Sequence, residues 1–264
     1  TGAIIKILTE NPNRLYSLNY FSEMFDAAKS TISEDIAIAR RILESFSQGE
    51  IVTIAGATGG VKYIPKVSKE ALEAFQEELC ERMSEKSRIM TGGFLFTSDL
   101  MFNPEIAKQA GRIFATKFLR SGADYVVTIE TKGISLAVMT ADAMNLPLVV
   151  MRRESKISEG STLSINYISG SGDKIQKMSV SKKSLMPGTK AVIIDDFMRG
   201  GGSASGMAEL LGELEIEVVG IGVLIATKEP EIKRVKEYSP ILYLDKPNEL
   251  TKTINIYPNT QLFQ

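Results

Sequence analysis

The sequence contains no histidine and a single cysteine, Cys80, among its 264 residues. Without an imidazole, Ser-His-Asp triads and His-ligated metal sites are excluded. A lone cysteine cannot form a disulfide within the chain, which is typical of a protein in a reducing compartment. The longest apolar stretches, such as residues 218–226, contain glycine and are too short to cross a bilayer. We therefore expect a cytoplasmic protein with no membrane partner, no signal peptide and no metal site built from its own residues.

An excess of charge of one sign is also lacking, because 31 basic and 32 acidic residues leave a net charge of −1. The overall charge therefore does not indicate a nucleic-acid partner, and any prediction of DNA binding has to rest on local geometry. Hydrophobic residues make up 44% of the chain, as in ordinary globular proteins. The length allows one large domain or two smaller ones.

The first part of the chain has the pattern of three helices followed by a β-hairpin. A short helix fits residues 18–25, and Thr31 with Glu34 forms a T-x-x-E capping box that opens the next helix. That helix carries an inward stripe at helical spacing, composed of Ile32, Ile36, Ala39, Leu43 and Phe46. Residues 51–54 and 61–64 flank a glycine-rich turn and predict a hairpin. We expect a winged helix-turn-helix domain over residues 1–73, and a small accessory or dimerising domain is the alternative.

From residue 74 to 264 the pattern changes to an α/β one, after a charged helix over residues 69–86 that spans the boundary. Apolar runs predict strands at residues 125–129, 148–151, 191–194 and 218–224. Between them lie predicted helices at residues 104–121, 134–144 and 203–214. Such alternation predicts a parallel sheet with helices on its faces.

The stretch AVIIDDFMRGGGS, residues 191–203, joins a buried strand to two carboxylates and a glycine-rich loop. In parallel sheets ligands bind outside the carboxyl ends of the strands. The loop and the following helix N-terminus suit an anion, whereas Asp195 and Asp196 suit the vicinal hydroxyls of a ribose. A Walker A loop would need Gly-Lys-Ser/Thr, and a Rossmann fingerprint places its acid after the glycines. A glycine-rich turn with two solvated aspartates is the alternative.

This stretch resembles the ribose-5-phosphate signature of the type I phosphoribosyltransferases, which bind phosphoribosyl pyrophosphate (PRPP). The resemblance implies that Asp195 and Asp196 hold the ribose hydroxyls and that Phe197 faces the region of a base. It implies that the 5′-phosphate is bound by Arg199, Gly200, Gly201, Gly202 and Ser203.

Two further segments are similar to that family. Residues 128–134 match its pyrophosphate loop, which carries over Thr131, Lys132 and Gly133, with Lys132 as a charge-assisted donor. Residues 152–172 lie where the family has a mobile loop, so Lys156 and Ser161 are expected to contact PRPP. A polar hairpin without a role is the alternative for this last segment.

Catalysis is not expected. The hypoxanthine-guanine enzymes have a carboxylate four positions after the first acid, where this chain has Arg199, which cannot accept a proton from a purine.

On the winged-helix interpretation, the third helix enters the major groove with its leading end. The residues expected to contact DNA are Lys29, Ser30, Thr31 and Ser33 on that helix, Lys62 on the hairpin, and Arg14. Arg40 and Arg41 are interpreted as solvated helix charges.

The two parts together resemble the purine operon regulators of Gram-positive bacteria. Residues 29–35, 59–65, 159–167 and 193–201 carry this resemblance. It implies a homodimer that binds double-stranded operator DNA and uses PRPP as its signal, with Mg²⁺ accompanying the ligand and without turnover. The alternative that the residues leave open is a cytosolic, xanthine-type purine phosphoribosyltransferase with an N-terminal accessory domain.

Overall fold

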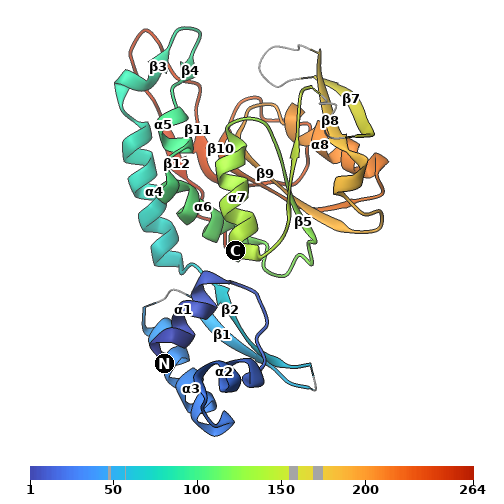
Figure 1. Cartoon of the computed structure of the whole chain (residues 1–264). Coiled ribbons are helices and arrows are strands. Elements are labelled where there is room, and N and C mark those ends of the chain that lie inside the picture. The colour runs from blue at the N-terminus through green and yellow to red at the C-terminus, as the bar shows by residue number, and fades with distance from the viewer. Residues whose placement is uncertain (47–48, 57, 155–159, 169–174) are drawn as a thin grey trace.

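The structure, a computed structural model, describes residues 1–46, 49–56, 58–154, 160–168 and 175–264. Figure 1 shows a small N-terminal domain below a larger α/β domain, with the C-terminus near the junction of the two. No helix in these ranges combines the length and the apolar character that a membrane span requires.

The small domain is a winged helix-turn-helix, as predicted. Its elements are α1 (Gly2–Glu10), α2 (Leu18–Phe25), α3 (Lys29–Ser45), β1 (Gly49–Ile54) and β2 (Gly60–Pro65). β1 and β2 pair as an antiparallel wing, and Tyr16 adds a bridge to Val61. Ile4, Leu8, Phe21 and the buried stripe of α3 pack on the wing as one core.

Two local predictions for α3 are wrong. The helix begins at Lys29 after an extended Ala28, without a side-chain cap, so Thr31 and Glu34 lie inside the helix. Burial of Ile32 and the bond from its N–H to the Ala28 carbonyl hold this first turn in place of a capping box. Phe46, predicted in the core, is 71% exposed, because it follows the last helical turn.

The large domain contains a six-stranded sheet in the order β12-β11-β10-β9-β5-β6. All neighbouring pairs are parallel except β11 with β12. The strands are β5 (Tyr125–Ile129), β6 (Leu148–Met151), β9 (Lys190–Met198), β10 (Glu217–Thr227), β11 (Ser239–Leu244) and β12 (Ile256–Pro258). The four predicted strands are all present, and β9 and β10 are longer than expected.

Two hydrophobic cores lie on opposite faces of this sheet. One face is covered by α4 (Lys69–Met83), α5 (Ser98–Met101), α6 (Pro104–Lys117) and α7 (Gly133–Met144). The other is covered by α8 (Gly202–Glu213) and by the hairpin of β7 (Thr162–Ile168) and β8 (Ile175–Ser181). Successive strand residues alternate between the cores, as pleating requires: Val192 and Ile194 belong to the first, Ile193 to the second.

The helix α4 belongs as a whole to the large domain. Its buried residues Leu72, Phe75, Leu79 and Met83 join the first core, and Gln76 Nε2 donates to the carbonyls of Ile241 and Asn259. We therefore propose that the domain boundary falls at residues 66–68, ahead of α4, instead of after residue 73. A short hairpin, β3 (Ile89–Met90) and β4 (Phe94–Leu95), follows α4 and rises beside the sheet (Figure 1).

Hydrogen bonds between described residues join the two domains. Asn13 Nδ2 donates to the Ala143 carbonyl at 2.8 Å, and the Val67 N–H donates to Thr116 Oγ1 at 3.0 Å. Arg112 on α6 lies 3.4 Å from the Tyr63 hydroxyl on the wing strand β2. The wing is therefore attached to the helices that cover one face of the sheet.

Candidate functional site

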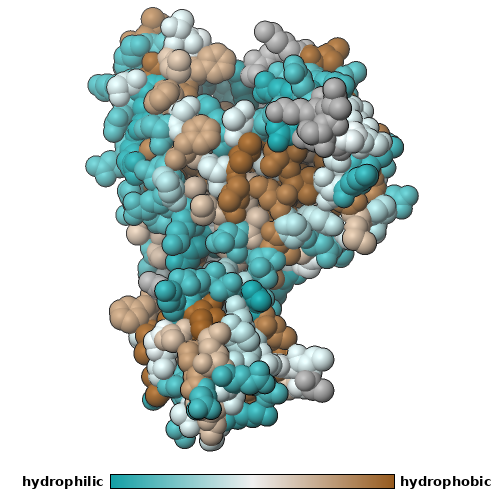
Figure 2. Space-filling model, viewed as in Figure 1, coloured by the Kyte–Doolittle hydropathy of each residue, from teal (hydrophilic) through white to brown (hydrophobic). Residues whose placement is uncertain are grey.

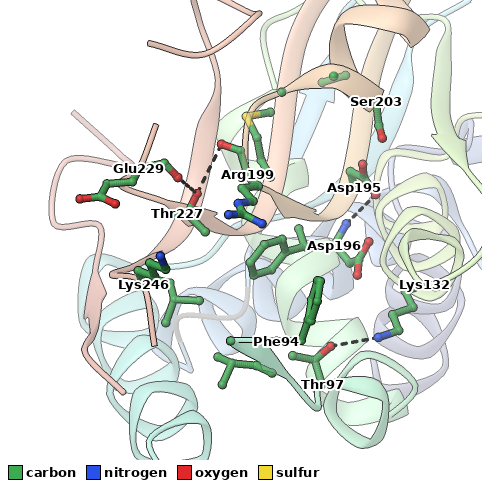
Figure 3. A pocket seen from close by; sticks show the side chains of 18 of the residues that line it. Phe94, Thr97, Lys132, Asp195, Asp196, Arg199, Ser203, Thr227, Glu229 and Lys246 are labelled. Atoms are coloured by element: carbon green, nitrogen blue, oxygen red, sulfur yellow. Dashed lines mark hydrogen bonds between the residues drawn. The ribbon is translucent and has the colours of Figure 1, made fainter. Parts of the chain in front are cut away.

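A cavity of about 540 Å³ lies where parallel strands of the sheet end. Thr227 and Leu244 end β10 and β11 and line the cavity, and Lys132 after β5 and Asp195 within β9 line it as well. Figure 3 shows these walls, with the acidic pair facing Lys132 and with Phe94 below. This is the position at which α/β sheets bind ligands.

The acidic pair lies inside β9, not at its end, because the strand continues to Met198. Both carboxylates line the cavity; Asp195 is only 6% exposed, and its Oδ1 accepts the Asp196 N–H at 2.9 Å. Burial, and then the adjacent Asp196 carboxylate, raise the pKa of Asp195 well above its ordinary value. The site therefore holds a desolvated acceptor that a hydroxyl donor would stabilise.

Gly133 makes the close packing beneath this pair possible. A Cβ atom at Gly133 would lie 2.7 Å from Thr128 Oγ1 and 2.9 Å from Asp195 Oδ1, so no side chain fits there. Thr128 Oγ1 is itself buried without a hydrogen-bond partner in the described part of the chain. The first turn of α7 thus approaches the acidic pair through backbone alone.

The loop from Arg199 to Gly202 connects β9 to α8. Gly201 has φ of 77°, in the left-handed region, and is the N-cap of α8. The first N–H groups of a helix lack partners within the helix and carry its positive dipole end. Gly201, Gly202, Ser203 and the Arg199 side chain line the cavity, whereas Gly200 is not among its lining residues. This wall is suited to an anion.

Lys132 supplies a second cationic wall. Its Nζ lies 3.4 Å from Thr97 Oγ1, and it is flanked by Thr131 and Gly133 in the turn between β5 and α7. The Glu130–Thr131 peptide bond in this turn is cis. Of the three residues carried over from the pyrophosphate loop, only Lys132 lines the cavity itself.

Of the two predicted mobile-loop residues, Ser161 is among the described residues and Lys156 is not. Ser161 is exposed at the base of the β7–β8 hairpin, where its carbonyl accepts the Lys182 N–H, and it does not line the cavity. Gln176 on β8 lines the cavity instead.

Several lining residues were missed by the sequence analysis. They come from the β3–β4 hairpin, from the last residue of β10 and from the segments after β10 and β11, and they include Phe94, Thr227, Glu229, Pro230, Lys246 and Pro247. With Phe197, Phe94 gives the cavity two aromatic rings, and Phe94 is 54% exposed. The dipeptide Gly92-Gly93 before Phe94 was the one local signal of a turn here.

The described residues contain no group of three or more cysteine, aspartate or glutamate side chains placed to hold a metal ion. Asp195 and Asp196 are two oxygen donors of the kind Mg²⁺ accepts. Mg²⁺ usually keeps several waters and binds through one or two carboxylates plus substrate phosphates. The pair therefore fits a Mg²⁺ ion that arrives with a phosphorylated ligand.

In the small domain, the four predicted residues of α3 are all exposed near its leading end: Lys29, Ser30, Thr31 and Ser33. Lys29 and Ser33 line a groove between α3 and the wing, together with Thr53 and Gly56. The wing residue Lys62 is half-buried, and the Arg14 guanidinium lies 5.2 Å from the centre of the Tyr16 ring.

Arg40 differs from its interpretation as a solvated charge. Its Nε donates to the Ile51 carbonyl and its Nη2 donates to Thr53 Oγ1, both at 2.9 Å. Arg40 therefore holds the wing strand β1 against α3.

Comparisons with known proteins agree with both domains. Residues 2–65 match the N-terminal domain model of the bacterial purine repressor, and residues 97–250 match the phosphoribosyl transferase domain model. The purine biosynthesis transcriptional repressor of Bacillus subtilis is 41% identical over 94% of this chain and 87% of its own length. The probable purine biosynthesis transcriptional regulator of Streptococcus pneumoniae is 41% identical over 96% of this chain and 92% of its own length. The purine biosynthesis transcriptional activator of Lactococcus lactis is 34% identical over 94% of this chain and 92% of its own length.

Among solved structures, adenine phosphoribosyltransferase from Rhodothermus marinus superimposes with a TM-score of 0.54 at 21% identity. The match covers 65% of this chain and 99% of that enzyme, and it supports the fold of the large domain. Fold and cavity together define a winged-helix protein with a type I phosphoribosyltransferase domain. Within that class, the chain belongs to the bacterial purine repressor family.

Proposed function

We propose that this protein is a DNA-binding transcription regulator of purine biosynthesis genes whose operator binding is controlled by PRPP. The similarity to purine biosynthesis regulators over nearly the full chain supports the first part. The relatives carry the names of repressor and of activator, so the sign of regulation is a property of each protein.

The observation that carries the proposed ligand is the composition of the cavity wall. The buried Asp195 carboxylate and the half-buried Asp196 carboxylate stand beside a helix N-terminus and, among the described residues, beside the cationic side chains of Lys132, Arg153, Arg199 and Lys246. Carboxylates repel phosphate but accept from sugar hydroxyls. A ligand that carries a ribose diol between phosphorylated ends satisfies both walls, and PRPP has this arrangement.

A structural connection between the two sites supports control of DNA binding by this ligand. The helix α7 begins beside Lys132 in the cavity and ends at Met144, where the adjacent Ala143 carbonyl accepts from Asn13 of the small domain. The Asn13 N–H also donates to the Tyr63 carbonyl in the wing strand β2 at 2.7 Å. A ligand that binds α7 differently in two states would bias the position of the wing.

We propose Mg²⁺ as the companion of PRPP and a homodimer as the functional assembly. Asp195 and Asp196 would face the ion, which neutralises the pyrophosphate.

The proposed dimer rests on an apolar surface. Figure 2 shows apolar side chains gathered beside α7 on the face of the large domain turned to the viewer. Val138 on α7 is 42% exposed, and Leu148 and Val150 lie half-buried on β6, the edge strand of the sheet. A second copy of the chain is the partner we propose for this face.

The alternative function is transfer of the phosphoribosyl group to a purine, which the match to the phosphoribosyl transferase domain favours. Arg199 argues against it, because its side chain lines the cavity as a permanent cation and cannot act as a base. We therefore propose a sensor without turnover.

One paired experiment tests these statements. A gel shift with operator DNA is measured with and without PRPP and Mg²⁺, beside a nucleotide-formation assay with each purine base. We expect operator binding that changes with PRPP and no nucleotide product. Rapid nucleotide formation from xanthine, without operator binding, would overturn the proposed regulator and favour the phosphoribosyltransferase.

A further inference from the structure

The loop between β9 and α8 contacts the segment that follows β10, in which Glu229 and Pro230 line the cavity. Residues 228–238 connect β10 to β11 without regular secondary structure. Lys233 Nζ donates to the Arg199 carbonyl at 2.6 Å, and the Arg234 N–H donates to the Gly200 carbonyl at 2.9 Å. The loop from Arg199 to Gly202 is the proposed anion-binding loop. Two consecutive carbonyls of this loop are therefore held by donors from one segment.

The network around Lys233 continues to β10. Lys233 Nζ lies 3.4 Å from Thr227 Oγ1, and the Thr227 hydroxyl donates to the Glu229 carbonyl at 2.6 Å. Thr227 Oγ1 is 3.3 Å from the Arg199 carbonyl oxygen, farther than the ammonium group. Lys233 is thus the nearest donor to that carbonyl, and Thr227 orients Lys233 (Figure 3 shows Thr227 with its two carbonyl partners).

The direction of a carbonyl fixes the direction of the next N–H. In a trans peptide the C=O of one residue and the N–H of the next point in opposite directions. The Arg199–Gly200 and Gly200–Gly201 peptides are trans, because the cis bonds of the described chain lie elsewhere. Lys233 and Arg234 do not line the cavity, whereas Arg199 and Gly201 do. Holding these two carbonyls against residues 228–238 turns the N–H groups of Gly200 and Gly201 away from their carbonyl partners in that segment.

The contact is also close enough to fix the loop in place. A Cβ atom at Gly201 would lie 3.3 Å from the Arg234 nitrogen and 3.4 Å from Val235 Cγ2. Burial and the nearby Arg199 charge lower the pKa of Lys233 relative to an ordinary lysine. Lys233 is half-buried against the loop, and its positive charge favours an anion bound nearby.

We infer that residues 228–238 form a strap behind the anion-binding loop and that Lys233 is a positioning residue for the phosphate of the ligand. It holds the Arg199 carbonyl so that the following N–H groups point at a phosphate monoester. The inference rests on the proposed function, since it assumes that a sugar phosphate occupies this loop.

The test is calorimetric titration of ribose 5-phosphate, which carries the diol and the monoester but no pyrophosphate, into the full-length chain. We compare Lys233→Met, which keeps the aliphatic stem, with Lys233→Arg, which keeps a cationic donor. Loss of a charged donor predicts about tenfold or greater weakening for Lys233→Met. Lys233→Arg should recover part of that loss. Lys236→Met, at an exposed lysine of the same segment, should bind like the wild type.

A second readout separates orientation of the loop from a general loss of structure. Titration of inorganic phosphate should move the amide resonances of Gly200 and Gly201 in the wild type and should move them much less in Lys233→Met. Thr227→Val, which removes the hydroxyl at nearly constant volume, should also weaken the binding of ribose 5-phosphate. This variant takes the place of Lys233→Met in the test if Lys233→Met does not fold.

The outcomes distinguish this inference from the proposed function. A wild type that binds neither ribose 5-phosphate nor PRPP would overturn the proposed ligand, and the strap with it. A wild type that binds ribose 5-phosphate, together with Lys233→Met and Thr227→Val variants of equal affinity and unchanged glycine shifts, would overturn the strap alone.

Discussion

Replacement of Asp195 by Asn is the sharpest test of the ribose assignment, because it should lower affinity and raise stability together. Asp195 is 6% exposed, and burial with the neighbouring Asp196 charge disfavours its ionised form. No salt bridge to Asp195 occurs within the described residues. Asn keeps one oxygen to accept the Asp196 N–H and removes the buried charge. The melting temperature of the variant without ligand should therefore rise.

The loss in ligand binding can be sized from the chemistry. A carboxylate accepts hydrogen bonds at two oxygens and carries a negative charge. An Asn side chain has one acceptor oxygen and no charge. Losing one hydrogen bond to a charged group costs about 1.5–3 kcal/mol, or roughly 10- to 150-fold in PRPP affinity. The binding of operator DNA without PRPP should not change.

The assay is calorimetry with PRPP and Mg²⁺, beside thermal unfolding without ligand. Asp142→Asn, at an exposed aspartate of α7, is the matched control and should change neither quantity. Wild-type PRPP affinity in Asp195→Asn would refute the ribose assignment. A lower melting temperature would refute the claim that the buried charge is held at a cost to stability.

The same reasoning gives a pH dependence. Binding requires the ionised Asp195, whose pKa in the free protein is raised, so PRPP affinity should weaken as the pH falls through that raised value. The ligand phosphates titrate as well, so the informative quantity is the difference between wild type and Asp195→Asn. That difference should shrink toward acid pH, and a difference that is constant with pH would contradict the assignment of the charge.

Two further predictions concern the DNA-binding domain and its attachment. Lys62→Ala should weaken operator binding. If Lys62 contacts one phosphate, the slope of log affinity against log salt concentration, measured by fluorescence anisotropy, should become shallower by about one unit. An unchanged slope would remove Lys62 from the interface. Asn13→Gly keeps a residue suited to φ of 58° but loses the bond to the Ala143 carbonyl, so PRPP should affect operator binding less, while PRPP and operator each bind alone as before. Asn145→Gly, at φ of 55° on the end of α7, is its control, and equal effects of the two substitutions would contradict a special role for Asn13.

Local sequence patterns predicted the bounds of several elements correctly. The bounds of α2, β5 and β6 agree with the expected ones, because their apolar periodicity and turn signals coincide. The capping box failed because tertiary packing of Ile32 extended α3 to Lys29. Periodicity also placed Phe46 in the core, although the helix ends before it.

The candidate site was predicted where its residues are contiguous and missed where they are not. Asp195 to Ser203 form one stretch with a known type of chemistry, and Lys132 follows a predicted strand. Phe94, Lys233 and Lys246 reach the same cavity or its supporting loop from distant segments. No spacing in the sequence relates these segments, because β11 and the β3–β4 hairpin set their positions only in the folded chain.

The central claim is that PRPP and operator DNA are energetically coupled through this chain, and linkage makes that claim measurable. PRPP affinity is determined by calorimetry with and without saturating operator, and operator affinity with and without saturating PRPP, at one salt and Mg²⁺ concentration. Binding free energies are reciprocal, so the two ratios must be equal, and we expect a factor of about 5 to 150. Ratios of one in both directions would contradict the account, since PRPP would then not be the effector that controls DNA binding.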